Sequence, residues 1–566
     1  MGTPRCAYEA NGIRRTAQAH SFDMSTRPSD FTSIVDLLAA PGTGPVRAQR
    51  PVYVDLLPPC NHACPAGENI QGWLEHARLG RYKEAWLTLV RDNPFPAVHG
   101  RVCYHPCEDK CNRGALDSAV SIHAVERFLG DRAAQEGWQL RVEAPLSGKR
   151  VLVVGAGPSG LSAAYHLARL GHTVEVRDAG PMPGGMMHFG IPAYRLPRED
   201  LMKEVRQIEA MGVTMVSDHK VEDLLAEKTE GGFDAVFVAI GAQQSKHVDI
   251  PARDAARVLD AVSFLRDVGE GEPPRLGRRV IVYGGGNTAM DAARTAKRLG
   301  AEEALIIYHR DRAHMSAHKF EAEEALEEGV KIKWLTSIRE IVGPTLAVEA
   351  MELDSEGRPQ PTGRIETLSA DAVVLALGQQ TDSAFLRNIP DMEFLPDGTV
   401  KVSPSMMTGH PGVFAGGDAV PSKRTVTAAV GHGKKAARHI DAWLRGGAYE
   451  APPKHPIVSF DMLNLPVYSD AARSEQPALP PARRVDGFAE VLAGLTEPEA
   501  TYEAQRCLSC GNCFECDQCY AACPEQAIEK LGPGRRYRYL YDRCTGCAVC
   551  FHTCPCHAIE MIPEPK

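Results

Sequence analysis

The sequence predicts an α/β protein of several domains, in which cysteine-rich regions flank a centre of alternating strands and helices. Three observations lead to this prediction. Short apolar runs alternate with amphipathic stretches through the centre, and glycine-rich turns follow two of these runs directly. None of the 17 cysteines falls between Cys111 and Cys507. The length of 566 residues also exceeds one compact core, since a domain typically holds about 150 residues.

Composition excludes several classes of protein. With 44% hydrophobic and 24% charged residues, the chain is neither disordered nor lipid-embedded, and it has no apolar run of about 20 residues. The formal charge of -9 comes without a basic block, so nucleic acid is not an expected partner. Residues 1–20 lack the apolar core of a signal peptide, so we expect a cytoplasmic protein. Cysteines in a reducing compartment indicate metal or redox chemistry.

Six apolar runs are the predicted strands of the central region, because they are short, rich in β-branched residues and separated by helical stretches. They lie at 151–154, 174–176, 235–240, 280–283, 304–308 and 372–377. The proline-rich, irregular stretch 452–481 is the predicted linker to the C-terminal region.

The first run leads into a Gly-x-Gly-x-x-Gly turn at 155–160 and then a helix, and Asp178 ends the next strand. Glycines allow the tight turn and the close approach of backbone amides to a pyrophosphate, while the acid accepts hydrogen bonds from a ribose. This combination predicts a dinucleotide site. A second copy of the turn follows the strand at 280–283. The chain is therefore expected to bind two nucleotides.

The strand after the second turn ends in Tyr308-His-Arg310-Asp311-Arg312. Arginines accommodate a ribose 2'-phosphate, whereas an acid at the strand tip selects a 2'-hydroxyl. Arg310 and Arg312 favour NADP, and Asp311 keeps NAD open. A solvated basic loop is the alternative interpretation of the arginines.

The C-terminal region holds two copies of the bacterial ferredoxin pattern, Cys-x2-Cys-x2-Cys-x3-Cys-Pro. Each copy gives three ligands to one [4Fe-4S] cluster and its fourth ligand to the other. One predicted cluster takes Cys513, Cys516, Cys519 and Cys554, and the other takes Cys544, Cys547, Cys550 and Cys523. Five further cysteines lie at 60–111, where zinc with His62 or His105 is the alternative to iron and sulfur.

Motifs beyond the second turn resemble a known family. The residues Gly412-Val-Phe-Ala-Gly-Gly417-Asp418 and the later Thr425-Val-Thr are similar to FAD-dependent pyridine-nucleotide oxidoreductases, in which an NAD(P) domain is inserted into an FAD domain. The stretches 184–197 and 284–291 resemble, more narrowly, the small subunit of glutamate synthase. Its relatives are the flavoprotein half of dihydropyrimidine dehydrogenase and the large subunit of bifurcating ferredoxin:NADP reductases. The resemblance covers about residues 59–445.

This resemblance implies two sets of cofactor-binding residues. His309 departs from it, since the relatives usually carry arginine there. The expected FAD set is Gly155, Gly157, Pro158, Ser159, Gly160, Asp178, Gly185, Met186, Arg195, Gly241, Gly417, Asp418, Thr425 and Val426. The expected NAD(P) set is Gly284, Gly286, Asn287, Thr288, Arg310 and Arg312, with Gly378 at the return to the FAD domain.

The resemblance also implies two [4Fe-4S] clusters in the N-terminal region. The near cluster, which lies by the flavin in the relatives, takes Cys64, Cys103, Cys107 and Glu126. The alternative for Glu126 is a solvated carboxylate on a helix face. The far cluster keeps only Cys60 and Cys111 there, because the family's leading Arg-Cys-Leu-x-Cys pair has no counterpart before Cys60.

That pair stands instead at Cys507 and Cys510, so the sequence is expected to be permuted. The competing interpretation makes Cys507 and Cys510 bystanders of the adjacent ferredoxin pattern. With the pair included, the expected cofactors are FAD, NADP and four [4Fe-4S] clusters.

The expected domains are a helical iron–sulfur domain (1–145), the FAD domain in two parts (146–272 and 376–448), an NAD(P) domain (273–375), a linker (449–500) and a ferredoxin domain (501–566). The ferredoxin motifs resemble the δ subunit of 2-oxoacid:ferredoxin oxidoreductases. The sequence thus predicts an electron-transfer flavoprotein subunit of a hetero-oligomer, with a 2-oxoacid oxidoreductase as partner and no catalytic acid or base of its own. Alternatives are a glutamate synthase small subunit, a bifurcating ferredoxin:NADP reductase, and an assembly protein with structural clusters.

Overall fold

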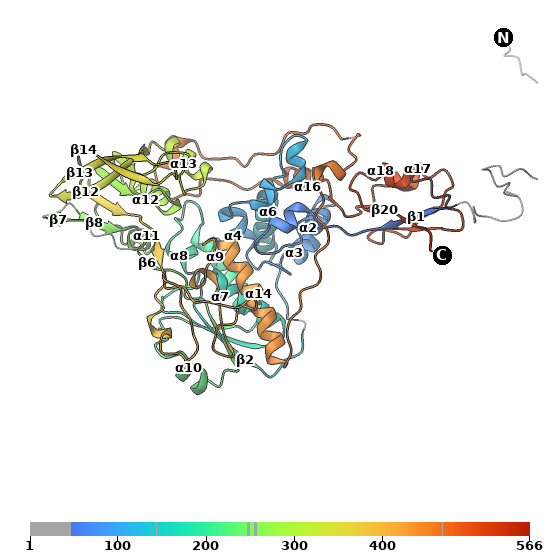
Figure 1. Cartoon of the computed structure of the whole chain (residues 1–566), viewed down its shortest axis with the longest axis horizontal. Coiled ribbons are helices and arrows are strands. Elements are labelled where there is room, and N and C mark those ends of the chain that lie inside the picture. Colours follow the sequence, from blue (N-terminus) through green and yellow to red (C-terminus); the bar gives the residue numbers. More distant parts are fainter. Residues whose placement is uncertain (1–46, 143, 246–249, 254–256, 467, 566) are drawn as a thin grey trace, which may run out of the picture. The chain divides into compact units, whose positions relative to one another are not determined.

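A computed structural model describes residues 47–142, 144–245, 250–253, 257–466 and 468–565 (Figure 1). Cys6 lies outside the described residues. The chain divides into two units. The first comprises the described parts of Met1–Val52, Asp517–Thr553 and Ile559–Lys566, and the second comprises the described parts of Tyr53–Cys516 together with Cys554–Ala558. Within the described ranges, no helix has the length and apolar character needed to cross a membrane.

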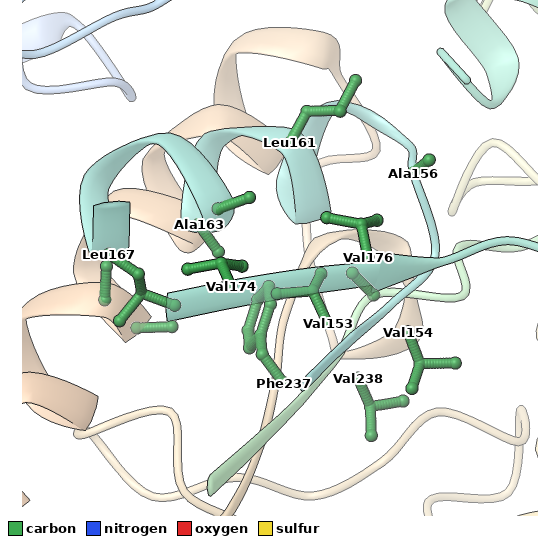
Figure 2. Close-up of a cluster of buried hydrophobic side chains, with 14 of the residues drawn as sticks. Val153, Val154, Ala156, Leu161, Ala163, Leu167, Val174, Val176, Phe237 and Val238 are labelled. Atoms are coloured by element: carbon green, nitrogen blue, oxygen red, sulfur yellow. The ribbon is translucent and has the colours of Figure 1, made fainter. Parts of the chain in front are cut away.

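The first large sheet of the second unit is parallel, with the order β17-β5-β2-β3-β4. Figure 2 shows apolar side chains of its strands packed with Leu161, Ala163 and Leu167 of a neighbouring helix, α7. Strand β17 enters this sheet long after β5, so the intervening chain is an insertion. The elements are β2 (Arg150–Val154), α7 (Pro158–Arg169), β3 (Thr173–Arg177), α8 (Met186–Phe189), α9 (Arg198–Glu209), β4 (Thr214–Val216), α10 (Leu224–Glu230), β5 (Ala235–Val238), β17 (Val413–Ala415) and α14 (Val426–Leu444).

The inserted chain forms a second parallel sheet, β11-β10-β9-β15-β8, and a four-stranded sheet, β14-β13-β12-β7. Strands β6 (Gln244–Ser245) and β16 (Gln379–Gln380) pair where the chain leaves and returns. The other elements are β7 (Ala252–Arg253), β8 (Arg257–Asp260), α11 (Ala261–Gly269), β9 (Arg279–Tyr283), α12 (Asn287–Arg298), β10 (Glu303–Ile307), α13 (Lys319–Glu327), β11 (Lys331–Lys333), β12 (Thr336–Val342), β13 (Thr345–Leu353), β14 (Pro359–Ser369) and β15 (Ala372–Leu375).

Two elements of the inserted chain, β8 and α11, precede residue 273, where the NAD(P) domain is predicted to begin. Strand β8 pairs with β15, and Phe264 and Leu265 of α11 belong to the same apolar core as the helices and strands that follow. The sequence pattern missed this strand because it is short and Val258 in its middle is 38% exposed.

A helical domain precedes the first sheet, and its core includes a segment from the other end of the chain. Leu495, Ala500 and Ala504 pack into the cluster that contains Trp73 and Trp86. Leu495 and Ala500 fall within the predicted linker 449–500 and are part of this core. The elements are α1 (Pro59–Ala63), α2 (Ile70–Arg78), α3 (Tyr82–Leu89), α4 (Pro96–Val102), α5 (Pro106–Asp109), η3 (Asn112–Ala115), α6 (Ile122–Glu136) and α16 (Glu497–Gln505).

The first unit has two similar halves, each a short helix next to a two-stranded sheet. The pairs are β18 with β19, antiparallel, and β1 with β20. Its elements are β1 (Gln49–Tyr53), α17 (Gln518–Ala522), β18 (Ile528–Lys530), β19 (Tyr537–Tyr539), α18 (Val549–Thr553) and β20 (Ile559–Pro563). The remaining short helices of the second unit are η4 (Ala384–Leu386), η5 (Gly417–Ala419), η6 (Phe460–Met462) and α15 (Pro481–Arg484).

Candidate redox cofactor sites

The first glycine turn leaves open space at one of its three glycines. A Cβ added at Gly155, whose φ is +106°, would lie 2.4 Å from the Ala239 carbonyl oxygen. At Gly160 it would lie 1.9 Å from the carbonyl oxygen of Gly155, whereas at Gly157 it would meet no atom within 4 Å. Because α7 begins at Pro158, its free backbone N–H groups lie beside this open position and suit a pyrophosphate.

Asp178 at the end of β3 closes the same turn. Its carboxylate accepts backbone N–H bonds from Ala156 (2.6 Å) and Gly180 (2.8 Å). A carboxylate has about four acceptor positions, so a ribose can still bind. Gly185, with φ of +53°, lies so close to this turn that a Cβ added to it would be 2.9 Å from Gly157 Cα. Met186, the first residue of α8, is therefore beside the turn.

The second part of this domain adds Gly417 and Asp418 to the same place. A Cβ on Gly417 would lie 2.9 Å from Ser159 Cβ. Burial raises the pKa of Asp418, while a hydrogen bond from Ser422 opposes the shift. Within the described part of the chain, the buried Ser159 Oγ and His432 Nδ1 have no hydrogen-bond partner. Buried polar atoms are rarely left unpaired, so these atoms and the open turn fit a bound FAD.

Helix α14 carries the remaining FAD candidates. Thr425 caps the helix by accepting a hydrogen bond from the Ala428 N–H, and Val426 is its first residue. The helix lies beside α7 (Figure 1), because Gly433 brings the two backbones so close that a Cβ there would lie 2.2 Å from the Ser159 carbonyl oxygen. Gly241 has φ of +68° and follows β5 in the neighbouring turn.

The second glycine turn repeats this geometry in the inserted domain. A Cβ on Gly284, whose φ is +149°, would lie 2.2 Å from the Ala376 carbonyl oxygen, whereas a Cβ on Gly286 would meet only Ser316 Oγ, at 3.6 Å. Asn287 and Thr288 begin α12 and are half-buried. This turn is also open on the side where a pyrophosphate would lie. Gly378 has φ of +101° and lies just before β16.

The loop after β10 carries Arg310 and Arg312, and its acidic residue, Asp311, bonds to another residue of the same loop. Asp311 Oδ1 accepts hydrogen bonds from the backbone N–H of His314 (2.9 Å) and interacts with its Nδ1 (2.7 Å). The Arg312 side chain is 67% exposed, and the buried Arg310 Nε has no hydrogen-bond partner among the described residues. Burial lowers the pKa of His309, and the neighbouring Arg310 lowers it further. The Asp311 carboxylate is therefore already bonded within its own loop, and Arg312 pairs with Glu323 at 3.8 Å.

Arg195, expected in the FAD set, is half-buried between the two nucleotide domains. Its guanidinium lies 2.8 Å from Asp291 of α12 and forms an ion pair with Glu321 of α13. Burial raises the pKa of Glu321 to about 7, while Arg195 lowers it. Sequence patterns did not identify Glu321, because its partner comes from a different domain and no local motif marks it.

The three expected thiols of the near cluster lie together with Glu126. The electrostatic neighbours of Cys64 include Glu126 and Cys103, and those of Cys107 include Cys103 and Cys64. Burial raises the pKa of all three thiols. Glu126 is 6% exposed and accepts a 2.9 Å hydrogen bond from Asn93. The carboxylate therefore does not lie on a solvated helix face.

The near-cluster thiols also contact the FAD domain. Thr427 of α14 donates its hydroxyl hydrogen bond to Cys103 Sγ, at 3.1 Å. The two residues belong to domains that are separate in sequence, and this contact is a direct connection between them.

The four expected ligands of the far cluster surround one cavity. Cys60, Cys111, Cys507 and Cys510 line it together with apolar residues such as Leu74. Burial raises the pKa of the Cys60 thiol, and the three other thiols raise it further. Buried thiols that oppose one another's ionisation need a cationic centre to hold them as thiolates, which an iron–sulfur core provides.

The ferredoxin cysteines divide between the units. Cys523, Cys544, Cys547 and Cys550 of the first unit line a single cavity, and Cys547 is exposed. The other predicted set has Cys519 on α17 of the first unit and Cys513, Cys516 and Cys554 in the second. Cys556, which is outside the predicted ligand pattern, is buried with its sulfur 3.8 Å from Cys554 Sγ.

Comparisons with known proteins identify the domain families of the chain. The chain matches the pyridine nucleotide-disulphide oxidoreductase family over residues 149–433. It also matches dihydropyrimidine dehydrogenase domain II, a 4Fe-4S cluster domain, over 44–138, and the 4Fe-4S dicluster domain over 512–558.

Three curated relatives span most of the chain. The β subunit of an NADP(+)-dependent formate dehydrogenase from Moorella thermoacetica is 36% identical and covers 80% of this chain and 70% of that protein. The β subunit of an NADPH-Fe(3+) oxidoreductase from Geobacter sulfurreducens is 33% identical, and the match covers 80% of this chain and 75% of that protein. The glutamate synthase [NADPH] small chain of Escherichia coli is 33% identical, and the match covers 68% of this chain and 89% of that protein.

The predicted fold class and the predicted resemblance to the glutamate synthase small subunit are both confirmed. This chain belongs to the pyridine nucleotide-disulphide oxidoreductase family and is an NAD(P)H-dependent oxidoreductase with FAD and iron–sulfur domains.

Proposed function

We propose that this protein is the NADP(H)-coupling subunit of a larger cytoplasmic oxidoreductase and that it holds one FAD and four [4Fe-4S] clusters. The observation that carries the proposal is the 3.1 Å hydrogen bond from the Thr427 hydroxyl to Cys103 Sγ, which joins the FAD domain to a near-cluster thiol. When bound, FAD exchanges a hydride with the nicotinamide and single electrons with the clusters. The chain's own residues hold these groups in order.

The near-cluster and far-cluster thiols lie in one helical domain. Cys60 of the far cavity is an electrostatic neighbour of Cys107, a near-cluster thiol. The two ferredoxin patterns supply the cysteines of two further clusters. Relatives that are β subunits or a small chain support a hetero-oligomer. We propose a large catalytic subunit that makes or uses low-potential electrons, with a 2-oxoacid oxidoreductase as the first candidate and a glutamate synthase large subunit as the second.

The nucleotide preference follows from Arg310 and Arg312. Replacing both by alanine is expected to raise the KM for NADPH roughly 10- to 150-fold, because losing the charge-assisted pair costs about 1.5–3 kcal/mol in total. The KM for NADH should change little. Steady-state kinetics with both nucleotides measure this. Arg364→Ala, an exposed arginine of β14, is the matched control. Equal effects on the two nucleotides, or a wild-type preference for NADH, would disprove the assignment.

The route by which electrons leave toward the partner is tested at the ferredoxin cluster that includes the exposed Cys547. Serine at both Cys544 and Cys547 is expected to abolish NADPH-dependent reduction of a bacterial 2[4Fe-4S] ferredoxin. Reduction of a dye that takes electrons directly from the flavin should continue at the wild-type rate. If ferredoxin reduction survives while the iron of this cluster is lost, the electrons leave the protein elsewhere.

A further inference from the structure

A tyrosine of the helical iron–sulfur domain reaches the second glycine turn. Tyr104 follows Cys103 in the loop between α4 and α5, and its hydroxyl oxygen accepts a 2.6 Å hydrogen bond from Asn287 Nδ2. Its ring stacks on His318, with the centroids 3.7 Å apart and the planes at 8°. Tyr104 is thus adjacent in sequence to a near-cluster thiol and contacts the nucleotide turn in space.

The two ends of the Asn287 amide are both bonded within the protein. Nδ2 donates to Tyr104, and Oδ1 accepts a 2.9 Å bond from the backbone N–H of His318. These two contacts fix which way the amide faces. One N–H and one lone pair remain, since an amide offers two donors and two acceptor positions. They lie at the start of α12, next to the open position of Gly286.

The loop that carries Tyr104 is held by contacts on both sides. His105 has φ of +54°, a left-handed conformation that is uncommon for residues other than glycine, and its backbone N–H bonds to Cys103 Sγ at 3.4 Å. The same sulfur accepts the hydroxyl bond of Thr427. A tyrosine anchored in this way is a rigid support for the residue that it contacts.

We propose that Tyr104 is a positioning residue of the NADP(H) site. It holds the Asn287 amide in the orientation that binds the dinucleotide, so the iron–sulfur domain completes a site that the inserted domain alone leaves unfinished. The inference rests on the proposed function of the second glycine turn as the NADP(H) site. It assigns Tyr104 no contact with the reacting atoms.

Tyr104→Phe in the full-length, cofactor-loaded protein tests the inference, because it removes the hydroxyl and keeps the ring that stacks on His318. The Kd for NADP+ should rise about 2- to 12-fold, the loss expected for one neutral hydrogen bond. The effect should appear in the KM for NADPH and not in kcat, with wild-type FAD and iron contents. Tyr82→Phe is the matched control, since it removes a hydroxyl bonded to Thr501 at 2.6 Å in the same domain. It should leave the Kd unchanged.

A double-mutant cycle shows whether Tyr104 acts through Asn287. Asn287→Ala alone should weaken NADP+ binding, and adding Tyr104→Phe should weaken it no further. A full Tyr104→Phe effect in the Asn287→Ala background, or a wild-type Kd in Tyr104→Phe alone, would overturn the inference. If the wild-type protein itself binds neither NADP+ nor NADPH, the proposed function fails as well. Normal wild-type binding with an inert Tyr104→Phe exchange refutes only the positioning role.

Discussion

Serine at both Cys507 and Cys510 is expected to remove about 4 of the roughly 16 irons that four bacterial-type clusters contain. The reason is that these two thiols line one cavity with Cys60 and Cys111, although about 400 residues of chain separate the pairs. A cluster that loses two of its four thiolates is not retained. Iron and acid-labile sulfide analysis of the purified protein measures the loss.

The matched control is Cys556→Ser, which changes a buried thiol outside the expected ligand sets and should keep all the iron. Serine at Cys60 and Cys111 should remove the same irons as the first pair. The quadruple variant should therefore lose about 4 irons and not about 8, because both pairs serve one cluster. A loss of about 8 would show that the pairs belong to different clusters, and the permutation hypothesis would then be wrong.

Alanine at Gly157 and alanine at Gly286 are expected to affect different nucleotides. The protein has room for a methyl group at both positions, since neither glycine has a positive φ and a Cβ meets nothing closer than 3.6 Å. A pyrophosphate that approaches these glycines would be crowded by the methyl group. Overpacking costs about 1–3 kcal/mol, or roughly 5- to 150-fold in affinity.

Gly157→Ala should therefore be purified with less FAD, and Gly286→Ala should keep FAD while its KM for NADPH rises. Absorption spectra and NADPH kinetics distinguish the two results. Gly487→Ala is the control, because that glycine also lacks a positive φ and has no atom within 4 Å of a Cβ. If Gly157→Ala raised the KM for NADPH and Gly286→Ala lowered the FAD content, the two turns would have been assigned to the wrong nucleotides.

Helix α16 illustrates what sequence patterns do not predict. Its residues carry no strong amphipathic signal, and the sequence interpretation ended the linker inside it at residue 500. The helix is stable because Ala500 and Ala504 fill a core whose other members come from the N-terminal helices. Thr496 and Glu499 form a capping box at its start, but burial of its alanines against distant residues is what makes the helix part of this core.

The sequence alone determined the cofactor classes and the positions of six central strands along the chain. Glycine turns after strands and repeated cysteine patterns are local signals, because each such motif lies within about ten residues. The resemblance of Arg506-Cys-Leu-Ser-Cys510 to the family's leading cysteine pair also raised the hypothesis that Cys507 and Cys510 complete a cluster with Cys60 and Cys111.

Only the tertiary structure decided which distant groups meet. It placed Asp291 and Glu321 around Arg195, Thr427 against Cys103, and Tyr104 against Asn287. None of these contacts has a sequence signature, because each joins residues from different domains. Their distances depend on how the domains pack against one another, which no periodicity within one element records.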